Sequence, residues 1–324
     1  MIELDGIIKT FRVSKRNSGM KEAVRAFFRR EYTTVNALSD VSFKINDGEM
    51  VGYIGPNGAG KSSTIKIMSG ILTPDSGKCV IDGLTPWKNR AKHVSHIGVV
   101  FGQRSQLWWD VPVIDSFELL RDIYSIDNRV YKSNLDELTT ALGISDIIKT
   151  PTRQLSLGQR MRCEIAASLL HSPSVLFLDE PTIGLDAVSK IAVREFVKKL
   201  NREHGTTVIL TTHDMQDIEA LTSRILLIGG GKILLDGNLD ELKARRSAVR
   251  TIKLEYSSGE VCECEGMKVS SAQRGHAVCT VDIQKLSVSG AIEFISKSAE
   301  ITDLSVEGTS AEELVVSLYK EFDI

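Results

Sequence analysis

The segment that most constrains this chain is the string GPNGAGKS at residues 55–62. Its spacing fits G-x-x-x-x-G-K-[ST], the pattern of a loop that wraps phosphate groups. The glycines let the backbone turn its N–H groups inward, and a helix that starts near Lys61 adds the positive end of its dipole. The apolar run 51–54 precedes the loop, which gives the strand–loop–helix context that the pattern requires. These residues predict an α/β core that binds a phosphorylated ligand.

Two side chains of this loop have separate expected roles. Lys61 should reach the β- and γ-phosphates of a nucleotide, and the hydroxyl of Ser62 should ligate magnesium. Further contacts to the nucleotide are expected from the loop itself and the first helical turn, at Gly55, Pro56, Asn57, Gly58, Ala59, Gly60 and Ser63.

A second motif, VLFLDEP at 175–181, ends an apolar strand with two adjacent carboxylates. Ligands of open α/β sheets bind at the carboxyl ends of the strands. Asp179 is therefore expected to hold the magnesium shell, and Glu180 to orient or deprotonate the attacking water. Two acids at a strand end also occur in solvated turns, but the phosphate loop upstream favours the catalytic interpretation.

Apolar runs that alternate with helical segments predict a parallel sheet covered on both faces. The expected elements of this part are strands at 1–11, 37–51, 51–54, 175–178 and 207–211 and helical segments at 61–69, 113–170 and 187–200.

The string LSLGQ at 155–159 lies just before the acidic strand and resembles LSGGQ, the signature of the ABC ATPase family. Leu157 replaces the middle glycine of the signature. Ser156 and Gly158 are kept, and the resemblance implies that they, together with Gln159, contact the γ-phosphate of ATP bound to a partner subunit. Because the chain has one phosphate loop and one signature, the resemblance implies a dimer with itself or with a paralogous ATPase.

Other family elements follow in order. Gln103 in VVFGQ resembles the Q-loop glutamine, which contacts magnesium and the attacking water; the extra residue Gly102 leaves Gln106 as the alternative. Asp186 in GLD resembles the D-loop aspartate, and His213 in LTTHD resembles the catalytic switch histidine.

Phe11 in IIKTF stands where this family has an aromatic residue that stacks on adenine. A phenyl ring on a strand serves equally well in a core, so both interpretations stay open. The resemblance covers about residues 1–240. It implies an ABC-type P-loop NTPase with a RecA-like core, an N-terminal antiparallel β subdomain and a helical signature subdomain at about 104–165, with ATP and Mg²⁺ as ligands.

The expected function is ATP hydrolysis by a subunit of an exporter-type ABC transporter. No apolar run approaches the roughly 18–20 residues that span a bilayer. The resemblance therefore implies transmembrane permease subunits as partners, with this chain peripheral on the cytoplasmic face of the cell membrane. Trp108 and Trp109 follow the Q-loop and are expected either to anchor that contact or to pack inside the helical subdomain.

The alternative function is that of a soluble ABC ATPase that acts on nucleic acid, or of a regulatory module. A net charge of −2 disfavours nucleic acid as a partner. The segment between Lys61 and Asp179 is too short for the long coiled coils of chromosome-clamp proteins. Glu180 and His213 together disfavour a purely regulatory module.

The segment 12–34 is rich in basic residues and interrupts the N-terminal strands. Polysaccharide-export ATPases have an extra helix at a similar place. Residues 20–32 are expected to form an amphipathic helix in which Phe27 and Phe28 share an apolar side and Arg29 lies on a basic one. Such a helix suits contact with anionic lipid headgroups, or docks its phenylalanines onto the ATPase core.

Residues 1–245 are expected to form the ATPase domain. Residues 246–324 are expected to form a second, small α+β domain. Cys262 and Cys264, with Cys279 and His276, resemble a set of metal ligands, but alternation places the first two on one face of a strand as small core residues. The expected elements of this domain are strands at 251–256, 261–264 and 277–281 and helices at 287–297 and 311–322.

Overall fold

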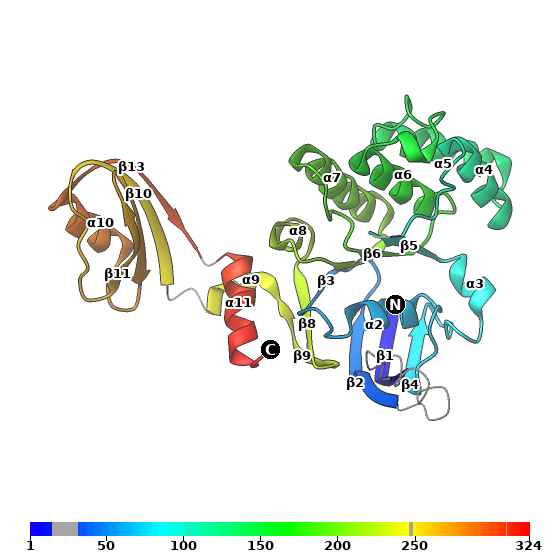
Figure 1. Ribbon diagram of the computed structural model, residues 1–324, viewed down its shortest axis with the longest axis horizontal. Coiled ribbons are helices and arrows are strands. Elements are labelled where there is room, and N and C mark those ends of the chain that lie inside the picture. Colours follow the sequence, from blue (N-terminus) through cyan, green and yellow to red (C-terminus); the bar gives the residue numbers. More distant parts are fainter. Residues whose placement is uncertain (15–31, 103, 246–248, 309) are drawn as a thin grey trace, which may run out of the picture. The chain divides into compact units, whose positions relative to one another are not determined.

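The computed structural model describes residues 1–14, 32–102, 104–245, 249–308 and 310–324 (Figure 1). These residues form two compact units. The first unit comprises residues 1–236 with Ile324, and the second comprises residues 237–323.

The first unit is built on a six-stranded sheet with the order β5-β6-β7-β3-β8-β9. The pairs β5–β6, β6–β7, β7–β3 and β3–β8 are parallel, as the continuous apolar runs predict. Its strands are β3 (Met50–Ile54), β5 (Ile97–Phe101), β6 (Val175–Asp179), β7 (Thr207–Thr211), β8 (Arg224–Gly229) and β9 (Lys232–Asn238).

Helices cover both faces of this sheet. Helix α2 packs between the two sheets of the unit, in contact with β2, β4 and β6, whereas α6 and α7 lie on the opposite side (Figure 1). The helices of this layer arrangement are α2 (Lys61–Met68), α3 (Arg90–Val94), α6 (Leu157–Leu169), α7 (Ala187–His204) and α8 (Met215–Leu221).

A second, antiparallel sheet has the order β2-β1-β4, from strands β1 (Ile2–Ser14), β2 (Tyr32–Ile45) and β4 (Ser76–Ile81). The basic insert expected at 12–34 is shorter at both ends, because residues 12–14 belong to β1 and residues 32–34 to β2. Arg12 pairs with Thr34 and Val13 with Thr33, because the hairpin continues its ladder beyond the expected strand ends. The helix expected at 20–32 lies outside the described residues, apart from Tyr32, which begins β2.

The helical part that the sequence predicts between residues 113 and 170 is confirmed as α4 (Val113–Ile123), α5 (Asn128–Ala141), the short 3₁₀ turn η1 (Thr152–Gln154) and α6. Asp127 caps α5, since its carboxylate accepts hydrogen bonds from the backbone of Arg129 and Val130. Helix α6 begins in the signature motif, and five residues separate its end from the acidic strand β6.

The second unit has a four-stranded antiparallel sheet with the order β11-β12-β10-β13. Its elements are α9 (Leu239–Arg245), β10 (Val249–Gly259), β11 (Met267–Gln273), β12 (His276–Asp282), α10 (Val288–Ser296), β13 (Ala299–Glu307) and α11 (Ala311–Glu321). Its core includes Leu254, Cys279 and Val281 of the sheet and Ile295 of α10. Because α9 contacts α11, the unit begins at Gly237, before the boundary at 246 that the sequence suggests.

The strand expected at 261–264 is absent from the described residues. These residues form an irregular segment closed by a single bridge between Cys264 and Met267. Cys262 is exposed, so the expectation that it is a core residue was wrong, whereas Cys264 is partly buried and packs against the core of the unit; Cys279 is buried. Four alternating residues do not distinguish a strand from a loop that turns back on itself.

Two features of the described residues bear on the function. None of their helices combines the length and apolar character needed to cross a membrane. Among the same residues, no group of three or more histidine, cysteine and acidic side chains is arranged to hold a metal ion.

Candidate nucleotide site

The phosphate loop lies between β3 and α2, and its glycines have different physical reasons. A Cβ on Gly55 would lie 2.2 Å from the carbonyl oxygen of Ile228, and one on Gly60 would lie 2.6 Å from that of Ala37. Gly60 also has a φ of 112°, a conformation that side chains disfavour. The tip residues Asn57 and Gly58 are exposed. Both ends of the loop therefore pack closely against neighbouring backbone, while its tip is exposed to solvent.

Lys61 is buried at the start of α2, with its ammonium inside the loop. Its Nζ donates hydrogen bonds to the carbonyls of Gly55 at 2.5 Å and Pro56 at 3.1 Å. Burial lowers the pKa of Lys61, and the charges of Glu180 and Asp179 oppose part of that shift. An anion that enters the loop offsets the cost of burying this cation, so the site favours phosphate groups.

The acid pair lies at the carboxyl end of β6. Asp179 accepts a hydrogen bond from the hydroxyl of Thr211 on the adjacent strand β7 at 2.5 Å. Glu180 has the left-handed φ of 56°, which is costly for a residue with a side chain. Its Oε1 lies 2.9 Å from Nε2 of His213. Two predicted catalytic residues are thus in direct contact.

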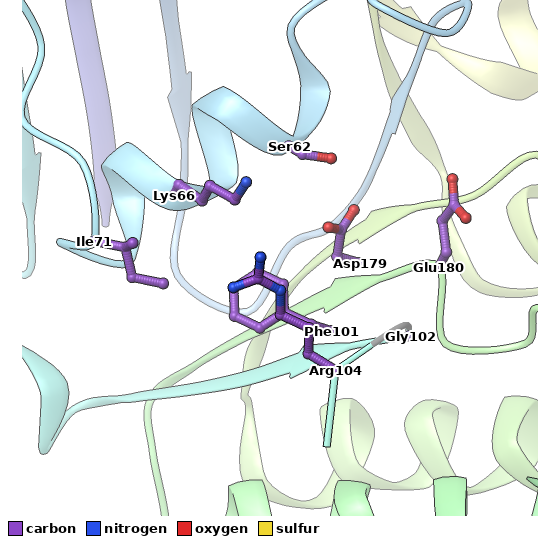
Figure 2. Close-up of a pocket in the computed structure, with 8 residues that line it drawn as sticks. All are labelled: Ser62, Lys66, Ile71, Phe101, Gly102, Arg104, Asp179 and Glu180. Atoms are coloured by element: carbon purple, nitrogen blue, oxygen red, sulfur yellow. The ribbon is translucent and has the colours of Figure 1, made fainter. Parts of the chain in front are cut away.

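A cavity of about 280 Å³ joins the phosphate-loop helix to the acid pair (Figure 2). Figure 2 shows Ser62, Asp179 and Glu180 around one end of this space, and Lys66, Ile71, Phe101 and Arg104 around the other; Gly102 completes the lining. The hydroxyl of Ser62 and the carboxylate of Asp179 are oxygen donors of the kind that Mg²⁺ prefers, so these residues fit that ion.

The signature motif forms the start of α6. Ser156 caps the helix: its Oγ accepts from the backbone N–H of Gln159 at 3.2 Å, while Oε1 of Gln159 accepts from the N–H of Ser156 at 2.9 Å. A Cβ on Gly158 would lie 2.3 Å from Oγ of Ser189, whose N–H and hydroxyl both bind the carboxylate of Asp186. The signature and the D-loop therefore touch within one chain.

The signature does not reach the cavity of the same chain. Among the described residues, neither Ser156 nor Gly158 lines the space between Ser62 and Glu180. The side chain of Leu157 instead lies against Gly184 of the D-loop, since a Cβ built there would meet its Cδ2 at 2.9 Å.

The remaining predicted site residues are placed as follows. Phe11 lies on β1, partly exposed, with Nζ of Lys9 at 5.7 Å from its ring centroid, and it does not line the cavity of Figure 2. Gln103 lies outside the described residues. The amide of Gln106 donates to the carbonyl of Val99 at 3.0 Å and is engaged there.

The sequence and the fold are similar to those of known proteins. Residues 38–183 match the family model described as ABC transporter. The uncharacterized ABC transporter ATP-binding protein YhcH of Bacillus subtilis is 31% identical over 288 residues, which covers 86% of this chain and 93% of that protein. This chain belongs to the ABC transporter ATP-binding proteins.

Two further likenesses support the family. The linearmycin resistance ATP-binding protein LnrL of Bacillus subtilis is 31% identical over 87% of this chain and 88% of its own length. The ATP-binding cassette MJ0796, solved as a dimer after hydrolysis with ADP and Pi bound, superposes with a TM-score of 0.61 at 26% identity, over 74% of this chain and 98% of that one. The ABC ATP-binding protein described here is an ATPase.

Sequence reasoning missed several polar residues around the acid pair of this ABC ATPase. Thr211, which binds Asp179, and Asp217, which accepts from Thr182 and Thr212, carry no motif of their own. The two threonines of LTTHD, directly before His213, were the available signal. A buried hydroxyl at a strand end needs a hydrogen-bond partner, and the nearest strand end carries the acids.

Proposed function

We propose that this ABC ATP-binding protein dimerises around ATP and Mg²⁺ and powers export through separate membrane subunits. The observation that carries the dimer is the separation of the signature from the cavity within one chain. A second copy or a paralogous subunit would supply Ser156 and Gly158 to the γ-phosphate bound by the first.

An apolar face beside the signature and the D-loop supports a covering partner. Val188 is 77% exposed and Ile191 58%, both on the first turns of α7, and Ile183 of the D-loop segment is exposed as well. Leu157, also exposed, lies against Gly184 of the D-loop. Large apolar side chains so exposed mark interaction surfaces when they gather beside functional motifs.

Within the proposed site, Lys61 and the loop N–H groups hold the β- and γ-phosphates, and Glu180 orients the attacking water. His213 fixes the carboxylate of Glu180 and contacts the γ-phosphate. Mg²⁺, held through Ser62, Gln103 and Asp179, would neutralise charge on the phosphates. Phosphoryl transfer then needs little more than this positioning.

The partners and the direction of transport belong to the same proposal. Trp108 is 45% exposed and Trp109 52%, so about half of each side chain is available for a contact with a permease subunit. The name of LnrL, a resistance protein, favours export. The proposed location is the cytoplasmic face of the cell membrane, with lipid headgroups as a further contact of residues 20–32.

The deciding experiment measures the mass of the Glu180→Gln protein in solution with and without Mg-ATP. We expect a dimer with ATP and a monomer with ADP, because binding is kept while hydrolysis stops. The control is the same variant with Lys61→Ala added, which should stay monomeric. A Glu180→Gln protein that remains a monomer at saturating ATP would overturn ATP-bridged self-dimerisation. Substrate uptake into inverted vesicles that contain the assembled transporter tests the direction.

A further inference from the structure

The two segments that carry Glu180 and His213 are both bound to one buried carboxylate. Asp217 lies on α8 with none of its surface exposed. Its Oδ2 accepts a short hydrogen bond from the hydroxyl of Thr182 and a second one from the hydroxyl of Thr212 at 3.1 Å. Thr182 lies two residues after Glu180, and Thr212 directly precedes His213.

The other oxygen of this carboxylate also has a partner. Its Oδ1 accepts from Nε of Arg194 on α7 at 2.6 Å, and Arg194 lies 3.3 Å from Asp214 through a second guanidinium nitrogen. Asp214 in turn pairs with Lys190 at 2.6 Å and caps α8 through its bond to the N–H of Gln216. A buried charge that is paired in this way is held in one place, because any displacement leaves it without partners.

The backbone of Glu180 needs such support. Its φ of 56° is a conformation that persists only where surrounding contacts over-determine it. The N–H of Glu180 donates to the carbonyl of Thr211 at 2.9 Å, which fixes the residue from the β7 side. On the other side, the chain turns through Pro181 to Thr182, where the first side-chain anchor is the bond to Asp217.

We infer that Asp217 is a positioning residue for ATP hydrolysis. It binds Thr182 and Thr212 through one oxygen atom and so sets the distance between the segments that carry Glu180 and His213. Asp217 itself does not touch those two side chains in any described contact. The inference rests on the catalytic role of Glu180 proposed above.

The test replaces the two hydroxyls one at a time, in Thr182→Val and Thr212→Val, and the acceptor in Asp217→Asn. Asparagine offers one acceptor oxygen and turns an NH₂ toward donors. The matched control is Thr222→Val at the end of the same helix, whose hydroxyl donates to the carbonyl of Ile218 at 2.9 Å within that helix. Steady-state kinetics give kcat and KM for ATP, and thermal melting reports folding.

We expect kcat to fall about tenfold to a hundredfold in Thr182→Val and Asp217→Asn, since misplacement of a reacting group by about 1 Å costs that much. KM for ATP should stay within about twofold, because the phosphate loop is untouched. Thr182→Ser, which keeps the hydroxyl, should restore kcat, and Thr222→Val should behave as the unmodified protein.

Unchanged turnover in these variants would overturn the inference. If the three variants keep the kcat of Thr222→Val while Glu180→Gln is inactive, Asp217 has only a structural role and the proposed role of Glu180 stands. If Glu180→Gln itself keeps normal turnover, the proposed function fails. Should Asp217→Asn not fold, the two threonine variants decide, since each removes a single hydroxyl.

Discussion

Oε1 of Glu180, just after β6, lies 2.9 Å from Nε2 of His213, just after β7, although the two residues are 33 positions apart in the sequence. The two strands are parallel neighbours, with Asp179 paired to Thr211 in register. Glu180, directly after β6, and His213, two residues after β7, therefore emerge at the same edge of the sheet. An acid and an imidazole held in this way can act on one water molecule and one phosphate group.

Replacing Glu180 by glutamine should lower turnover about 10²–10⁴-fold, because the amide cannot accept a proton from water. ATP binding should be kept, since Lys61 and its loop are unchanged. The measurements are phosphate release and binding of a fluorescent ATP analogue. The control is Glu137→Gln, which changes an acid that is paired with His204 at 3.0 Å on the surface. Near-normal turnover in Glu180→Gln would show that another group activates the water.

Replacing Lys61 by methionine should abolish the stabilisation that Mg-ATP gives to the protein. At a ligand concentration 100 times Kd, this stabilisation is about 2.7 kcal/mol. Without nucleotide, the variant should melt no lower than the unmodified protein. Burial lowers the pKa of Lys61, which means that the charged ammonium destabilises the folded protein, and methionine removes that charge. Melting curves with and without Mg-ATP test both statements, with the exposed Lys92→Met as control. A normal ATP shift in Lys61→Met would exclude the phosphate contact.

Glu164 gives a prediction about pH. Burial raises the pKa of its carboxyl, although the hydroxyl of Ser105 and the N–H of Gln106 bind it. The folded protein therefore takes up a proton at a higher pH than the unfolded chain. The stability that this group contributes is present at low pH and is lost as pH rises from the ordinary glutamate value through the raised one.

Glu164→Gln removes this titration while glutamine can still accept from Gln106 and donate to Ser105. We expect the difference in unfolding free energy between Glu164→Gln and the unmodified protein to grow in favour of the variant as pH rises through that interval, and then to level off. Denaturant unfolding at a series of pH values measures it. A difference that does not change with pH would show that Glu164 titrates normally.

Replacing Gly158 by alanine should destabilise the first unit, because the new Cβ would meet Oγ of Ser189 at 2.3 Å and its Cβ at 2.9 Å. Overpacking of this kind costs about 1–3 kcal/mol. Adding Ser189→Gly to the same chain removes both clashing atoms and should recover part of the loss. Ser189→Gly alone is the control, since glycine in a helix has its own cost. If the double variant is no more stable than Gly158→Ala, the two residues do not share this contact.

Replacing Trp108 and Trp109 together by alanine should leave the unfolding free energy within about 1 kcal/mol, as for other surface positions. The guanidinium of Arg160 lies 5.7 Å from the ring centroid of Trp109, a contact that the variant loses. Phe117→Ala, at a fully buried position of α4, should cost about 3–5 kcal/mol and calibrates the measurement. In the assembled transporter, the double variant should hydrolyse ATP but transport less substrate. Loss of folding in the double variant would contradict the surface role.

Features that depend on neighbours in the chain were predictable. The loop at 55–62 needs its glycines wherever it occurs, and strand β7 is bounded in the structure at the residues that its apolar run indicates, Thr207–Thr211. The strand expected at 261–264 was wrong, and β13 was missed, because most of its residues are exposed and its ladder with β10 is formed by residues far away in sequence.

The sequence by itself determined the chemistry of this protein: a phosphate loop, an acid pair and a signature, each written in a few adjacent residues. Only the tertiary structure decided which of these groups meet. Glu180 contacts His213, and Asp217 binds Thr182 and Thr212, because parallel strands bring distant segments to one edge of a sheet. Such contacts leave no local pattern, since each partner is satisfied by a residue from another part of the chain.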